Sequence, residues 1–112
     1  MEIKIKGSPF GSITRTRVLL CLNLLGTSFQ RELARLLDSS PSVVQKALNG
    51  LERDGLVSGR MMGRTRSYTL NPRYFAKIEF AAFLRRLAEA DADLQARTAE
   101  LRRRPRRAGK PL

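Results

Sequence analysis

Histidine and tryptophan are absent from this chain of 112 residues, and Cys21 is its only cysteine. Without histidine there is no imidazole base, no Cys-His nucleophilic pair, and no His/Cys set for zinc within one chain. A single cysteine excludes an intramolecular disulfide. The acidic residues are scattered, so paired carboxylates are missing too. We therefore expect no metal, no cofactor and no enzymatic activity.

Long apolar runs are also missing. Residues 1–6 alternate apolar and charged side chains and do not resemble a secretory signal, and no run approaches the ~20 apolar residues of a membrane-spanning helix. We expect a cytoplasmic protein without a membrane partner. In that reducing setting Cys21, flanked by Leu20 and Leu22, is predicted to be a small buried hydrophobe rather than a redox sensor.

Acidic residues are scarce relative to basic ones. The chain has 22 Lys and Arg against 10 Asp and Glu, a formal net charge of +12. Excess cations bind phosphates and release condensed counterions, so a polyanion is the expected partner. A ribosomal or membrane-surface protein would show the same imbalance, and charge alone therefore favours nucleic acid without selecting it.

Three helices are predicted by apolar residues at helical spacing, over about 13–25, 29–37 and 41–54. Gly26 and Gly55 are placed to end the first and third of them. The start signals are Thr27 and Ser28 as caps of the second helix, and Ser40 as the cap of the third, followed by Pro41 in its first turn.

The third predicted helix has two distinct faces. Its apolar face is formed by Val44, Ala47, Leu48 and Leu51. Its polar face carries hydrogen-bonding groups and no acid, at positions i, i+3, i+4 and i+7: Ser42, Gln45, Lys46 and Asn49. By itself this pattern is also that of an ordinary solvated helix face.

A basic hairpin follows. Residues 56–62 and 66–70 read as strands joined by Gly63, Arg64 and Thr65. Arg60, Arg64 and Arg66 crowd the ribbon, while Tyr68 and Leu70 are expected to turn inward.

A long helix is predicted over about 73–104, because Phe80, Leu87, Leu94 and Leu101 recur every seventh residue without Gly or Pro between them. The stripe either packs back on the same domain or pairs with a second copy of the chain. We favour pairing, with Leu84 added to the interface. Residues 105–112 read as a basic disordered tail, and residues 1–6 as a short edge strand or an ordered tail.

The order of helices and hairpin resembles winged helix-turn-helix transcriptional regulators of the ArsR and MarR type. The residues that carry the resemblance are the runs 29–37, 41–48, 51–57 and 63–72. The implied fold is mainly α with a small β hairpin: a winged-helix DNA-binding domain over 1–72, then a C-terminal dimerisation helix over 73–104. Arsenical sensors of this type carry Cys or His metal ligands, which this chain lacks.

The resemblance implies that the helix 41–54 enters the major groove and that the wing, 60–66, contacts the backbone or minor groove. The implied DNA-binding residues are Ser42, Val43, Gln45, Lys46 and Asn49 on the helix, and Arg60, Arg64, Thr65 and Arg66 on the wing. The Gln and Asn amides can form two hydrogen bonds with an adenine edge, and Lys can donate to the acceptors of guanine. Val43 can contact a thymine methyl. The expected partner is a palindromic DNA operator in the nucleoid, bound by a homodimer. The alternative is a winged-helix adaptor that binds RNA or protein.

Overall fold

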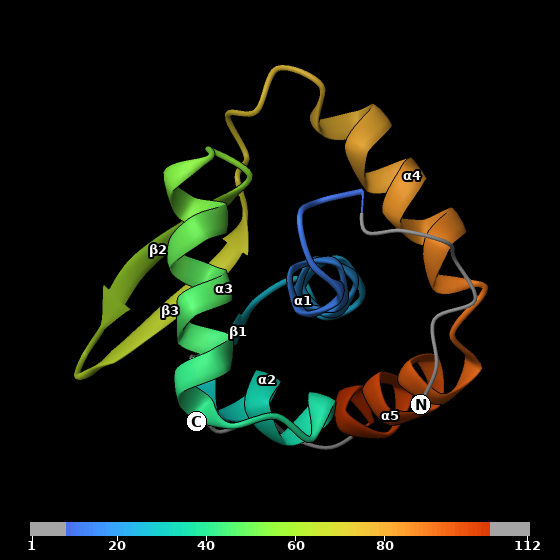
Figure 1. Ribbon diagram of the computed structural model, residues 1–112, viewed down its shortest axis with the longest axis horizontal. Coiled ribbons are helices and arrows are strands. Elements are labelled where there is room, and N and C mark those ends of the chain that lie inside the picture. The colour runs from blue at the N-terminus through green and yellow to red at the C-terminus, as the bar shows by residue number, and fades with distance from the viewer. Residues whose placement is uncertain (1–8, 104–112) are drawn as a thin grey trace.

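Helix α1 (Ile13–Leu25) forms the centre of the computed structural model, which describes residues 9–103. Figure 1 looks down its axis and shows the other helices and the sheet arranged around it. Val18 to Leu22 are five consecutive residues with no exposed surface. A helix that is apolar on all sides is stable only when it is surrounded. Ser12 caps its N-terminus and Gly26, at φ 88°, ends it, which confirms the predicted bounds.

The helix-turn-helix consists of α2 (Gln30–Leu37) and α3 (Pro41–Arg53). The turn between them contains Asp38 in the left-handed conformation, at φ 52°. The hydroxyl of Ser40 accepts a hydrogen bond from the backbone of α3, so the predicted start of that helix is confirmed. The predicted caps of α2 are wrong, because its N-cap is Phe29 and no side chain caps it.

The residues expected to cap α2 lie in a third strand instead. Strand β1 (Ser28–Phe29) pairs with β3 (Thr65–Leu70), which also pairs with β2 (Val57–Met62). The sheet is antiparallel, in the order β1-β3-β2. The hairpin was predicted to within about a residue at each end, whereas β1 was not predicted. Two residues are too few to show the alternation that identifies a strand.

The C-terminal region is two helices, α4 (Lys77–Ala88) and α5 (Ala92–Arg102), and the prediction of one continuous helix is wrong. The chain turns at residues 89–91, where the buried carboxylate of Asp91 accepts a hydrogen bond from the backbone N–H of Leu94, at 3.1 Å. Asp disfavours helix interiors because its side chain competes for backbone donors, and it favours N-caps. The turn allows both helices to pack along α1.

The heptad stripe mostly faces the interior of the same chain. Of its four residues, Phe80 and Leu94 are buried there, Leu87 is partly buried against the core, and Leu101 is partly exposed. Leu84, which was added to the predicted interface, is buried as well. Packing on the same domain therefore accounts for most of the stripe. Pairing with a second copy stays a prediction.

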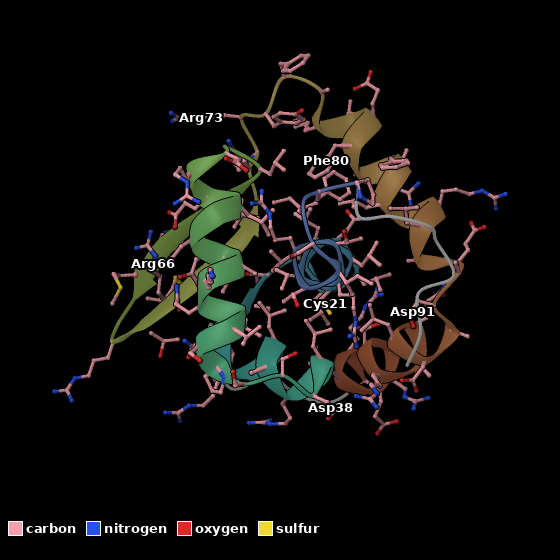
Figure 2. The ribbon with its side chains drawn as sticks, viewed as in Figure 1. Cys21, Asp38, Arg66, Arg73, Phe80 and Asp91 are labelled. Atoms are coloured by element: carbon pink, nitrogen blue, oxygen red, sulfur yellow. The ribbon has the colours of Figure 1, made fainter. Side chains whose placement is uncertain are left out.

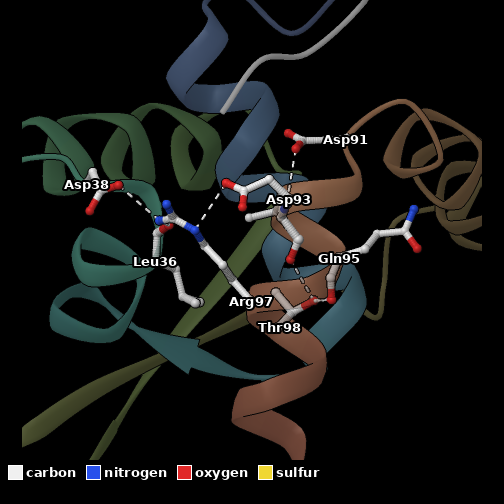
Figure 3. A network of polar contacts seen from close by, with 8 residues as sticks. Leu36, Asp38, Asp91, Asp93, Gln95, Arg97 and Thr98 are labelled. Carbon is white, nitrogen blue, oxygen red and sulfur yellow. Dashed lines mark hydrogen bonds and ion pairs between the residues drawn. The ribbon is translucent and has the colours of Figure 1, made fainter.

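Helix α5 is joined to the helix-turn-helix by one arginine (Figure 3). Arg97 Nη1 donates to the carbonyl of Leu36, at 2.8 Å, and to the carboxylate of Asp38, at 3.0 Å. Its Nε lies 3.2 Å from Asp93, one turn earlier on α5. The hydrogen bond to Asp38 raises the pKa of Arg97 above its ordinary value. The contact fixes α5 against the end of α2.

Two predictions, the strand or ordered tail at residues 1–6 and the basic tail at 105–112, lie outside the described residues. Within 9–103, no helix has the length and apolar character that crossing a bilayer requires.

Candidate nucleic-acid interface

The outward face of α3 is open to solvent. Ser42, Lys46 and Asn49 are exposed, as is Val43, whose side chain is 47% accessible. The opposite face packs into the core through the four apolar residues predicted for it: Val44, Ala47, Leu48 and Leu51. Figure 1 shows α4 and α5 on the other side of α1 from α3, so neither helix covers the outward face.

Gln45 differs from the rest of the predicted reading face, because both ends of its amide are hydrogen-bonded and two of its partners lie on other elements. Its oxygen accepts from Gln30 of α2, at 3.1 Å. Its nitrogen donates to Asn49 Oδ1, at 2.9 Å, and to the hydroxyl of Tyr68 on β3, at 3.1 Å. Tyr68 is only 1% accessible. Gln45 therefore connects α2, α3 and the sheet, and it orients Asn49.

The wing carries two arginines that are free of ion pairs with other described residues. Arg60, Arg64 and Thr65 are all exposed. Arg60 pairs in register with Ser67, and Arg64 lies in the two-residue turn between β2 and β3. Both guanidinium groups are available for an anionic partner.

Arg66 lies on the other face of the ribbon and has a different environment. Its Nη2 donates to Glu52 of α3, at 2.6 Å, and its guanidinium lies 5.7 Å from the centre of the Tyr68 ring. The hydrogen bond and the charge of Glu52 raise the pKa of Arg66 above its ordinary value. This arginine ties the wing to α3, whereas the sequence prediction grouped it with Arg60 and Arg64.

Gly59 provides the room for that contact. A Cβ at this position would lie 2.8 Å from Arg66 Nε and 2.9 Å from Tyr68 Cε1, closer than such atoms approach. The alternation of a strand places Arg66 on the same side as Tyr68 and Leu70. That signal was present in the sequence and separates Arg66 from the solvent-facing arginines.

A pocket of about 320 Å³ lies between the wing and α2. Gln30 and Arg31, the first residues of α2, line it together with Gln45 and Arg64. Sequence reasoning missed Gln30 and Arg31, because nothing local shows that the start of α2 faces the wing. Arg31 adds an exposed cation to this flank.

Cys21 is the one nucleophile that the sequence offered as a sensor, and it lies in the core. The thiol has no exposed surface, and desolvation raises its pKa to about 12 despite the opposing charge of Arg17. Among residues 9–103 no three His, Cys, Asp or Glu side chains gather as metal ligands would. Figure 2 shows Cys21 near the middle of the fold, away from α3 and the wing.

No family model matches the chain, and no curated protein matches its sequence. Solved structures do match. Reduced HlyU from Vibrio cholerae is 32% identical, with a TM-score of 0.56 over 70% of this chain and 76% of HlyU. Two variants of ZitR from Lactococcus lactis, both 20% identical, have TM-scores of 0.61 and 0.57. They cover 88% and 89% of this chain, which spans 64% and 63% of theirs.

These matches carry different weight. At 20% identity the likeness to ZitR shows the fold alone, a winged helix with its small sheet. The likeness to HlyU is greater in sequence and extends over three quarters of that protein. HlyU and ZitR are both winged-helix transcriptional regulators. The chain therefore belongs to the winged-helix transcriptional regulators.

Proposed function

We propose that this protein binds double-stranded DNA with sequence preference, α3 lying in the major groove and the wing on the backbone or in the minor groove. The observation that carries the proposal is the open face of α3, which presents Lys46, Asn49 and Val43 without an acidic side chain. Unpaired cations lie beside it on the wing. This combination of hydrogen-bonding groups and positive charge suits a groove lined by phosphates.

The two parts of the interface have different roles in this proposal. Lys46, Asn49 and Ser42 reach base edges, and Val43 offers an apolar contact for a thymine methyl. Arg60 and Arg64, with Thr65, contact phosphates or a narrow minor groove and so contribute affinity and register. Gln45 positions Asn49, and Arg66 holds the wing against α3.

We further propose that two copies act together, residues 1–72 forming the DNA-binding unit and the helices after it contributing to pairing. Support comes from α4 and the turn before it, where Ile78 is 75% and Phe75 92% accessible. Leu87 and Leu101 of the heptad stripe are also partly exposed. Two-fold pairing would present two α3 helices to half-sites about one DNA turn apart, as in a palindromic operator.

Selection from a pool of random duplexes, followed by mobility-shift titration of the selected sequences, tests the reading face. The wild-type protein is expected to enrich a defined sequence and to bind less tightly as salt rises. Replacing Lys46 and Asn49 together by Ala is expected to reduce discrimination between selected and random duplex by about 10-fold or more, since each base-reading pair contributes ~1–3 kcal/mol.

The matched control is Lys77→Ala, which removes the same single charge from an exposed position of α4. It is expected to leave sequence preference unchanged. Unaltered preference in the Lys46 and Asn49 double variant would show that another surface reads the bases. Retention of structured RNA or of one protein, with no binding to any duplex, would overturn the proposed function in favour of an adaptor.

A further inference from the structure

We propose that the flank of α3 opposite the wing is a second phosphate site, in which Arg15 and Arg53 hold a backbone phosphate of the bound duplex and Lys46, at its edge, adds positive charge. The inference rests on the proposed DNA binding and adds a contact region that the sequence did not suggest. It concerns the junction between the N-terminus of α1 and the outer side of α3.

A pocket of about 320 Å³ occupies this junction. From α1 and its cap, Ser12, Thr14 and Arg15 line it, and from α3, Lys46, Gly50 and Arg53. None of its lining residues is acidic. The site therefore combines three cationic side chains with two hydroxyl groups, which are the donors that phosphate oxygens accept from.

The two arginines converge on one point above Gly50. A Cβ built there would lie 3.0 Å from Arg15 Nη1 and 3.5 Å from Arg53 Nη2. The contact with Arg53 would be an ordinary one, whereas the contact with Arg15 would be tight, so the missing Cβ lets the Arg15 guanidinium lie close over α3. Two like charges brought so near one another repel, and an anion bound between them would remove that repulsion.

Little in the described part of the chain neutralises this positive charge. Asp54 forms an ion pair with Arg15 through Nη2, while the other end of that guanidinium lies over Gly50 and its buried Nε has no hydrogen-bond partner. Arg53 and Lys46 make no ion pair within residues 9–103. The junction is thus a concentration of positive charge with one carboxylate at its margin.

The position relative to α3 indicates which phosphate would bind. Gln45 lines the pocket on the wing side, and its neighbour Lys46 lines this one, so the two pockets flank the same exposed face of α3. A helix in a major groove ~12 Å wide lies between two phosphate backbones. The wing side contacts one backbone, and the junction of α1 and α3 contacts the other.

The test measures duplex binding over a series of salt concentrations. Arg53→Gln is the main variant, because Arg53 is exposed and its replacement breaks no ion pair within 9–103. The probe is a random-sequence duplex. A plot of the logarithm of the association constant against the logarithm of the salt concentration is expected to have a slope shallower by about one in this variant. Arg85→Gln on α4 makes the same charge change at an exposed position away from α3 and is expected to leave the slope unchanged.

Gly50→Ala provides a second approach, because the added Cβ would lie 3.0 Å from Arg15 Nη1 and would require that end of the guanidinium to shift. Weaker duplex binding with an unchanged helical circular dichroism spectrum is expected. Equal slopes for the Arg53→Gln and Arg85→Gln variants would overturn the site, as would a change in sequence preference without a change in slope. Absence of duplex binding by the wild-type protein would instead refute the proposed function itself.

Discussion

Cys21 lies on the central helix, where burial rather than neighbouring charge governs its chemistry. Desolvation raises the pKa of the thiol to about 12, and the opposing effect of Arg17 is smaller. The thiolate is the nucleophilic and metal-binding form of cysteine, and it is scarcely populated at neutral pH with such a pKa. The side chain therefore acts as a packing group of α1.

The raised pKa of Cys21 predicts a pH dependence of stability. The ordinary thiol pKa is 9.0, so between pH 9 and about 12 the unfolded chain loses a proton that the folded chain retains. The free energy of unfolding is thus expected to fall as pH rises through this window, by up to about 1.4 kcal/mol per pH unit. Below pH 9 the thiol is protonated in both states and does not change the free energy of unfolding with pH. Cys21→Ala should lack this part of the decrease.

Denaturant unfolding of both proteins at a series of alkaline pH values checks this. The variant also loses packing in the core, which lowers its stability at every pH. The informative quantity is therefore the slope of the free energy of unfolding against pH, compared between the two proteins. Every other residue is the same in both proteins, so the comparison isolates the contribution of the thiol. Identical slopes would show that the thiol ionises as readily in the folded chain as in the unfolded one.

At the scale of elements, the turn between α4 and α5 decides how the C-terminal region packs. Asp91 is 1% accessible, and one of its oxygens caps α5 through Leu94. Because the chain turns here, Leu94 and Thr98 are buried and Arg97 reaches the end of α2. A continuous helix would carry these side chains away from the core.

Asp91→Ala is expected to lower the free energy of unfolding by about 1 kcal/mol, because the N–H of Leu94 loses its acceptor. Asp93→Ala is the control, since it removes an equal charge from the same turn, where the side chain is exposed and its ion pair with Arg97 is screened. Urea unfolding measures the free energy of unfolding of both variants and of the wild-type protein. A loss no greater for Asp91→Ala than for Asp93→Ala would contradict the capping role.

At the scale of the whole molecule, one side presents α3 and the wing and another presents α4 (Figure 1). The proposed pairing predicts that the protein sediments as a dimer and that Ile78→Asp, which places a charge on an exposed apolar position, yields a monomer. Binding to a palindromic duplex should weaken by at least about 10-fold, because the two half-sites are no longer bound by one linked pair.

Ala92→Asp is the control for added charge, at an exposed position of the first turn of α5, and should remain dimeric. Analytical ultracentrifugation over a range of protein concentrations distinguishes the species. A wild-type protein that stays monomeric throughout would refute the pairing without affecting the proposed DNA-binding face, because one copy presents α3 and the wing by itself.

The sequence by itself determined the elements whose signals are local. Gly26 ends α1, Ser40 begins α3, and apolar spacing identified the buried side of α3. The exposed character of Lys46 and Asn49 followed from the same periodicity. Caps, turns and helical spacing act over a few residues, so they can be interpreted without knowing the rest of the fold.

Only the tertiary structure decided which distant residues meet. Strand β1 exists because β3 is beside it, and Arg66 holds the wing because Glu52, on another element, lies within reach. Arg15 and Arg53 share one pocket although 37 positions separate them in the chain. Packing of α1 against its neighbours creates these contacts, and packing depends on the whole set of buried surfaces rather than on any local pattern.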